Sequence, residues 1–411
     1  MLSAPLLSLV VLVAPTVGPV GAERRLPDLV KLTGGEEIEC RVLYEDDQEV
    51  LYRSKRGEKR VPRAEVAEVH SIERSLREFL QRYEKVADVD KAGLAQLATF
   101  AEENDLPGEA RNLWIRVLAL DGENEQAWTK LGGVKGRKGW KLQVRGRFYD
   151  LEELKTRASD WKNALELSTA HFLIKTDVDP LRALNGSIDL ERAYQTFYEV
   201  IGKPLKLTVF DEEPEVHIFL DPKDYPTPPS EGVNVWFSPG ANTLYVNYTA
   251  GPTPGAIVSE LTQCLIFNSF RRSADSKTGE IEAWARQGLM SCFAVAVRPE
   301  PGRVQFEFAA PYGPWFEKAA QDPEPLELKR ILTSGRSAFD NGAESERYVI
   351  GAYTLVHFMV YGQGGKYRPA LATFMRDSFL GKGGKTRFFE CVGMKEAEFE
   401  SEWKAYVQSE G

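Results

Sequence analysis

The spacing of apolar residues changes several times along this 411-residue chain, and the order of these changes restricts the folds that it can adopt. Apolar and polar residues alternate in five short segments between residues 29 and 69, which is the period of β-strands. Apolar residues three and four positions apart, the period of α-helices, follow from 94 to 118. Alternating segments return between 170 and 248, and helical spacing prevails after 256. Because sheet segments precede helical segments instead of alternating with them, we predict an α+β fold.

The five N-terminal segments predict a domain of their own at residues 23–72. Turn-forming pairs such as Gly34-Gly35 and Asp46-Asp47 separate the segments. Five short strands in about fifty residues are typical of a small β-barrel, similar to Sm-like modules. The segment carries no residue set whose chemistry we recognise.

Residues 73–164 are predicted to form a helical linker. The segment 108–132 resembles one tetratricopeptide unit and the start of the next. A helical solenoid needs at least about three repeats before it buries a core of its own. We therefore expect a tetratricopeptide-like linker and not a peptide-binding solenoid.

The first 22 residues carry no charged side chain and include an apolar run followed by prolines and small residues. This pattern is typical of a signal peptide cleaved before Glu23, with an uncleaved anchor as the alternative. We expect export to the periplasm, the cell surface or the medium, and no further transmembrane segment. The net charge of -9 argues against nucleic acid or an anionic membrane as a partner.

Two apolar helical segments, 256–267 and 282–293, carry the strongest functional signal. The first contains Ser-Glu-Leu-Thr-Gln at 259–263, and the second contains Trp-Ala-Arg-Gln-Gly-Leu at 284–289. In order and spacing they resemble the two helices of the peptidase MA-like gluzincins, a family of largely uncharacterised bacterial proteins. An upstream hairpin at 233–248 and C-terminal segments around 353, 364 and 402 extend the resemblance over a domain at 165–411. The resemblance implies a mixed sheet followed by a helical subdomain.

In this family the first helix carries His-Glu-x-x-His, whose histidines lie one turn apart and bind zinc while the glutamate polarises water. The resemblance places Ser259, Gln263 and Gln287 at the three ligand positions and leaves Glu260 as a vestigial general base. A hydroxyl and two neutral amides are poor zinc ligands. We therefore expect a pseudoenzyme that binds no metal or other cofactor. The alternative is an active zinc peptidase whose ligands we do not recognise.

The resemblance also implies a cleft lined by Trp236, Tyr353 and His357, in which a peptide or protein partner binds. An extended peptide would bind there as an additional strand beside residues 233–237. A core role for His357 is an equal alternative. The other histidines, His70, His171 and His217, do not stand at helical ligand spacing, and we expect satisfied strand or core positions for them.

Cys264 and Cys292 lie one on each of the two helices, and export to an oxidising compartment makes them a candidate disulfide. The alternatives are two buried apolar thiols, or a cysteine nucleophile that uses His357 as its base. The segment 381–386, Gly-Lys-Gly-Gly-Lys-Thr, is not a P-loop, because Phe379 stands where that motif needs glycine.

Overall fold

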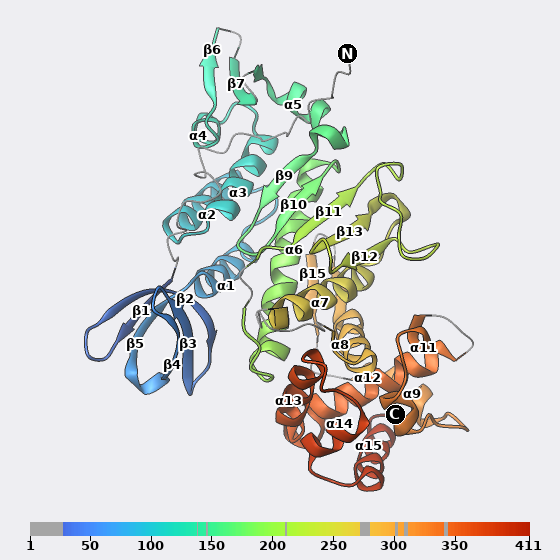
Figure 1. Cartoon of the computed structure of the whole chain (residues 1–411). Helices are drawn as coiled ribbons and strands as arrows, with labels where there is room; N and C mark the ends of the chain where they lie inside the picture. The colour runs from blue at the N-terminus through green and yellow to red at the C-terminus, as the bar shows by residue number, and fades with distance from the viewer. Residues whose placement is uncertain are drawn as a thin grey trace, which may run out of the picture.

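A computed structural model describes residues 28–411 except 138, 145–146, 210–211, 272–279, 301–302, 308–310 and 341–343 (Figure 1). The predicted α+β class is confirmed: separate sheets are followed by a large group of helices. The signal peptide predicted at 1–22 lies outside the described residues. Among the helices that the structure describes, none is both long and apolar enough to cross a membrane.

The N-terminal sheet consists of five antiparallel strands in the order β4-β3-β2-β1-β5. They are β1 (Asp28–Leu32), β2 (Glu37–Glu45), β3 (Glu49–Ser54), β4 (Gly57–Pro62) and β5 (Val66–His70). All five predicted strands are present, but the barrel prediction is wrong. In the described part of the chain β4 and β5 remain the two edges of an open sheet and do not pair with each other.

The composition and length of the two edge strands explain why the sheet stays open. In β4 the side chains of Glu58, Lys59 and Arg60 are exposed, and an edge strand that carries charges resists pairing. The other edge, β5, is only five residues long, and the chain passes at once into a helix that Ser71 caps.

The linker region contains helices and one small sheet. Its elements are α1 (Ile72–Tyr83), α2 (Lys91–Glu103), α3 (Pro107–Leu120), α4 (Glu125–Lys130), β6 (Val134–Gly136), β7 (Gly139–Val144), β8 (Arg147–Tyr149) and α5 (Leu151–Ala158). The apolar spacing from 94 to 118 predicted α2 and α3 correctly. The small sheet, in the order β6-β7-β8, interrupts the helical linker that we expected, and α5 ends at Ala158, before β9 begins at Leu165.

A second five-stranded sheet lies at the centre of the molecule. Its strands are β9 (Leu165–Ser168), β10 (Leu173–Thr176), β11 (Glu215–Phe219), β12 (Val235–Ser238) and β13 (Thr243–Asn247). The order is β12-β13-β11-β10-β9, with parallel pairing of β10, β11 and β13 and antiparallel pairing at both edges. The predicted hairpin is therefore the β12–β13 edge of this sheet.

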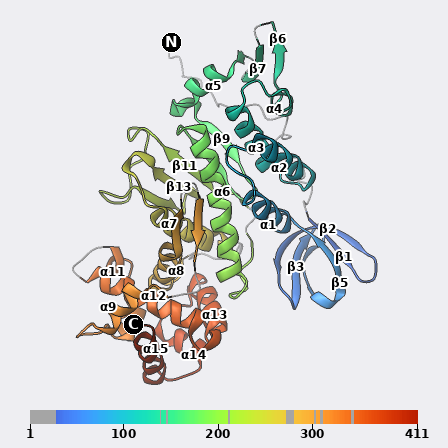
Figure 2. The ribbon, with the colours of Figure 1, turned by 180° about the vertical axis from the view of Figure 1, so that it is seen from behind.

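Helices α6 (Pro180–Phe197) and α7 (Pro254–Arg271) cover one face of the central sheet, as the view from behind shows (Figure 2). Helix α8 (Ala283–Ala296) packs on α7 and continues into the short hairpin of β14 (Val297–Glu300) and β15 (Arg303–Phe306). Both helices predicted from the apolar segments 256–267 and 282–293 are present; α7 extends beyond both predicted ends, whereas α8 begins one residue later and ends three residues later than predicted.

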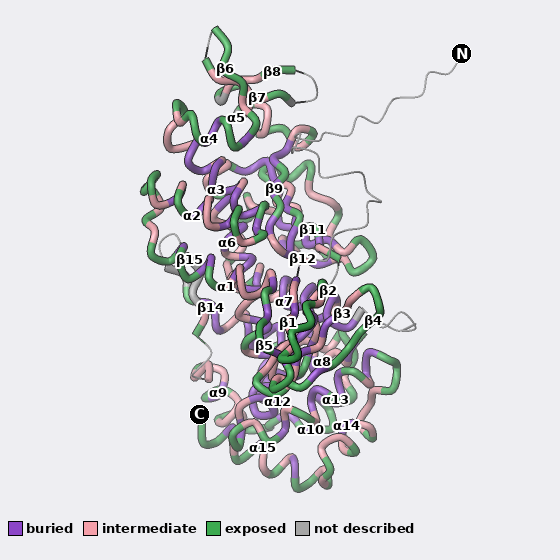
Figure 3. Tube along the Cα trace, turned by 90° about the vertical axis from the view of Figure 1, so that its left-hand side faces the viewer, coloured by how far each residue is buried: buried purple, intermediate pink, exposed green. Residues whose placement is uncertain are grey.

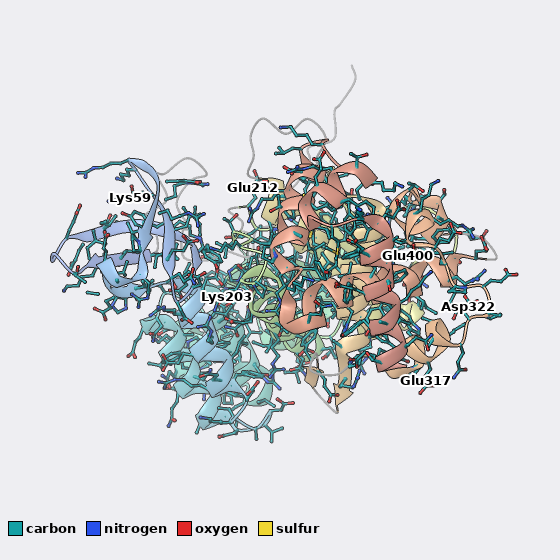
Figure 4. All side chains as sticks on the ribbon, turned by 90° about the horizontal axis from the view of Figure 1, so that it is seen from below. Lys59, Lys203, Glu212, Glu317, Asp322 and Glu400 are labelled. Atoms are coloured by element: carbon teal, nitrogen blue, oxygen red, sulfur yellow. The ribbon has the colours of Figure 1, made fainter. Side chains whose placement is uncertain are left out.

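The C-terminal part is entirely helical in the residues described. It comprises α9 (Gly313–Ala320), α10 (Leu328–Leu332), α11 (Ser337–Asp340), α12 (Ser345–Tyr361), α13 (Arg368–Phe379), α14 (Lys385–Val392) and α15 (Glu396–Glu410). Residues 350–360 of α12 are all buried, so this helix forms the centre of the group (Figure 3). Seen from below, Glu317 of α9, Asp322 of the loop after it and Glu400 of α15 lie on the side away from the N-terminal sheet, which carries Lys59 (Figure 4).

Candidate functional site

The glutamate of the motif, Glu260, lies on α7 and binds the edge of the central sheet. Its Oε2 atom accepts a hydrogen bond of 3.1 Å from the main-chain N–H of Phe237 in β12. This N–H points out of the sheet, away from the neighbouring strand. An outward N–H on an edge strand can pair with a further strand, and here a carboxylate of the same chain accepts its hydrogen bond instead.

The three positions at which the resemblance predicts metal ligands all carry neutral side chains. Ser259 and Gln263 lie one turn apart on α7, and Gln287 lies on α8, which packs against α7. Gln263 is buried, whereas Ser259 and Gln287 are half-buried. The amide of Gln287 donates within its own helix, to the hydroxyl of Ser291 at 3.3 Å. The side chain at the position of the third ligand is thus directed along α8.

Trp236 lies on the opposite face of the central sheet from α7. Side chains alternate along β12, and Phe237 packs its ring against Phe267 of α7 at a centroid distance of 5.6 Å. The ring of Trp236 instead packs at a tilt of 32° against Tyr245 of β13, at a centroid distance of 4.7 Å. The predicted role of Trp236 in a cleft beside α7 therefore does not agree with its position.

Tyr353 and His357 lie inside the group of C-terminal helices and not on a surface cleft. They are 1% and 6% exposed because α12 is surrounded by other helices. The Tyr353 hydroxyl accepts the main-chain N–H of Tyr312, and His357 Nδ1 lies 2.9 Å from the Tyr406 hydroxyl. Burial lowers the pKa of His357 to about 4, so its imidazole is neutral at ordinary pH. Of the two roles considered from the sequence, the structure gives His357 the core role.

Cys264 and Cys292 are both free and buried, so the candidate disulfide is not formed in the structure. The two thiols have different neighbours. The amide of Asn268 donates to the Cys264 sulfur at 3.5 Å, whereas Cys292 lies near Tyr353 on α12. Burial raises the pKa of both thiols, which opposes the thiolate form that a nucleophile needs.

The residues that the structure describes contain no group of three or more histidine, cysteine or acidic side chains arranged to hold a metal ion. The histidines on strands bind neighbouring carboxylates: His70 Nε2 lies 2.9 Å from Glu68 and His217 Nε2 lies 2.8 Å from Glu215. The expectation of satisfied positions for these two histidines is confirmed.

His171 belongs to a buried cluster of charged residues that the sequence did not reveal. It lies in the turn between β9 and β10 and bonds a carboxylate at each ring nitrogen, Glu191 of α6 at 2.8 Å and Glu73 of α1 at 3.0 Å. The Tyr194 hydroxyl also donates to Glu73, at 3.0 Å. Arg41 of the N-terminal sheet lies 3.6 Å from the same carboxylate. One cluster therefore ties the N-terminal sheet and α1 to the central sheet.

The electrostatics of the cluster follow from its burial and its charges. Burial alone would lower the pKa of His171, but the charges and hydrogen bonds of Glu73 and Glu191 outweigh it and raise the pKa to about 10. Burial would likewise raise the pKa of Glu73, yet His171 and Arg41 hold it at about 2. His171 is thus a cation between two carboxylates, an arrangement that stabilises a fold only while each charge keeps its partners.

Comparisons with known proteins do not extend the resemblance: no protein-family model and no curated protein sequence matches the chain.

Proposed function

We propose that the region 165–411 is a non-catalytic, metallopeptidase-like module and that the protein works as an exported binding or structural protein. The observation that carries the proposal is the bond from the Phe237 N–H to Glu260. A glutamate that activates water must direct its carboxylate to a metal-bound water molecule. Here the carboxylate holds β12 on α7, which is a structural task.

The donor set at the three ligand positions supports the same proposal. Ser259, Gln263 and Gln287 offer one hydroxyl and two amides, and zinc sites use imidazole, thiolate or carboxylate instead. His357, the histidine that the sequence placed in the expected cleft, is buried among aromatic rings such as that of Phe316, at 5.3 Å. Its conversion to a metal ligand would require the rearrangement of this core.

Zinc binding distinguishes this proposal from its alternative, a zinc peptidase with unrecognised ligands. The mature protein purified without chelator is expected to carry no stoichiometric zinc and to leave a general peptide library uncleaved. The combined variant Ser259→His, Gln263→His, Gln287→Glu is expected to bind about one zinc per chain if the two helices keep the gluzincin geometry. About one zinc per wild-type chain, together with chelator-sensitive hydrolysis, would overturn the proposal.

The C-terminal helices offer a place for the binding role. A cavity of about 610 Å³ lies between α9, the loop after it, α12 and α15, which is the size of typical ligand pockets. Its wall combines the apolar Leu326 and Val407 with Thr354 and the ion pair of Arg347 with Asp322 at 2.9 Å. Such a mixture suits a peptide, because apolar side chains and main-chain amides both find partners.

The binding role can be tested on α15, where two neighbouring exposed residues differ in their relation to the cavity. Lys404 lines it, whereas Ala405 is not part of its wall. Lys404→Trp is expected to reduce the capture of short random peptides by the immobilised mature protein, and Ala405→Trp is expected to leave it unchanged. Equal capture by both variants would exclude this cavity as the peptide site.

A further inference from the structure

A second cavity lies between the central sheet and the two helices that cover it. Its volume is about 190 Å³, and α6, α7 and the strands β10, β11 and β13 form its wall. Most of the wall is apolar, with Leu190 from α6, Val216 and Ile218 from β11, and Ile257 and Leu261 from α7. On α7 these positions lie on the side of the helix opposite to Ser259 and Gln263, so the cavity is separate from the peptidase-like site.

A glycine inside α6 opens this cavity. Gly186 lies in the middle of an 18-residue helix and belongs to the cavity wall. A Cβ atom at this position would meet no atom within 4 Å. Glycine in a helix interior is unfavourable relative to alanine, and here no close contact requires it. The missing side chain therefore leaves space and does not serve helix packing.

The polar groups of the wall bind other groups of the protein, and the cation at the rim, Arg182, binds a neutral hydroxyl. The Thr176 hydroxyl accepts the Val178 N–H at 3.1 Å, and Asp189 lies 3.1 Å from Arg192. Arg182 is exposed one turn before Gly186 and donates to the Tyr248 hydroxyl at 3.1 Å. In the described part of the chain no carboxylate forms an ion pair with Arg182.

We infer that this cavity binds a medium-chain fatty acid, with the alkyl chain between α6, α7 and the sheet and the carboxylate at Arg182. An apolar cavity of about 150 Å³ is known to accept a molecule of benzene's size, so 190 Å³ accommodates a chain of about eight carbons. An anionic head group complements the cation at the rim. A peptide fits less well, because its amides would enter a wall whose polar groups are already engaged.

Calorimetric titration of the mature protein with octanoate, octanol and octylamine tests the inference. Octanoate is expected to bind more tightly than octanol, and octylamine is expected to bind least. Gly186→Leu should abolish octanoate binding because its side chain fills the cavity. Ile257→Trp, which closes the cavity from the half-buried rim of α7, provides a second variant if the first fails to fold.

The head group is tested with Arg182→Gln. This variant is expected to weaken octanoate binding on the order of ten-fold, the loss of one charged hydrogen bond, and to leave octanol binding unchanged. The inference would be overturned if the wild-type protein did not bind octanoate, or if the two cavity-filling variants bound it as tightly as the wild type does. It would also be overturned if Arg182→Gln weakened the binding of octanoate and of octanol equally. Tighter binding of an acetylated leucine peptide than of octanoate would overturn it in favour of a peptide ligand.

Discussion

Glu109 makes the stability of the protein depend on pH in a direction that can be calculated. This residue of α3 is 1% exposed; its Oε1 accepts the Ala170 N–H at 2.7 Å, and its buried Oε2 has no hydrogen-bond partner among the residues that the structure describes. Burial, and then the charge of Glu191, raise its pKa from 4.5 to about 8. Glu109 is therefore a protonated, neutral side chain at neutral pH.

The sign of the effect follows from proton linkage. Between pH 4.5 and pH 8 the folded protein keeps a proton on Glu109 that the unfolded chain releases, so the free energy of unfolding falls as pH rises. One pKa unit corresponds to about 1.4 kcal/mol, and the fall from pH 5 to pH 8 amounts to about 3 kcal/mol. The pKa of His171 is raised from 6.5 to about 10, so His171 also lowers the free energy of unfolding as pH rises from 6.5 to 10.

Glu109→Gln isolates the first of these effects, because the amide resembles the protonated carboxyl but does not titrate. In urea denaturation the variant and the wild type are expected to have similar free energies of unfolding at pH 5. At pH 8 the variant should be more stable by about 3 kcal/mol. Glu103→Gln, which removes an exposed carboxylate from α2, controls for the change in net charge. Parallel curves for wild type and Glu109→Gln over this range would refute the assignment of a buried neutral carboxyl.

Three further substitutions test the helix packing and the bond between α7 and the edge strand β12. Gly288→Ala is expected to destabilise the protein by about 1–3 kcal/mol in thermal denaturation, because its Cβ would lie 2.4 Å from Val356 and 2.5 Å from a main-chain oxygen of α12. Gly186→Ala, in open space, is expected to stabilise by about 0.5–1 kcal/mol, and equal effects would contradict the helix packing. Glu260→Ala should destabilise by about 1–3 kcal/mol and increase hydrogen exchange at the Phe237 amide; unchanged exchange would show that the bond between them is absent.

The sequence allowed good prediction of elements whose apolar pattern is regular over their whole length. Alternation identified all five N-terminal strands, and the apolar runs identified α7 and α8. The closure of a sheet depends on contacts between its first and last strands, and alternation within a strand does not report on them. The strands β6 to β8 were missed because their segment, 134–149, mixes charged, glycine and aromatic residues without a clear period.

One residue of the buried cluster could have been suspected from the sequence. On α6, Glu191 falls on the same face as Leu184, Ile188 and Tyr194, which are apolar or aromatic. A carboxylate on a buried face needs a partner. The partner could not be identified, because contacts between distant parts of the chain, such as that of Glu73 with residues on α6, leave no local pattern.

The register of a single strand decides whether Glu260 is structural. In the observed pairing Phe237 lies opposite Leu244 and Trp236 lies opposite Tyr245, so the side chain of Phe237 faces α7 and its N–H is available to Glu260. A slip of one residue would turn Trp236 towards α7 and would return the Phe237 N–H to the ladder with β13. Glu260 would then lose the acceptor role that it has in the structure. Five residues of helix sequence contain no information about this register, which depends on the packing of Phe237 against Phe267. The same five-residue motif is therefore compatible with a catalytic or a structural glutamate, and the neighbouring edge strand determines which of the two it is.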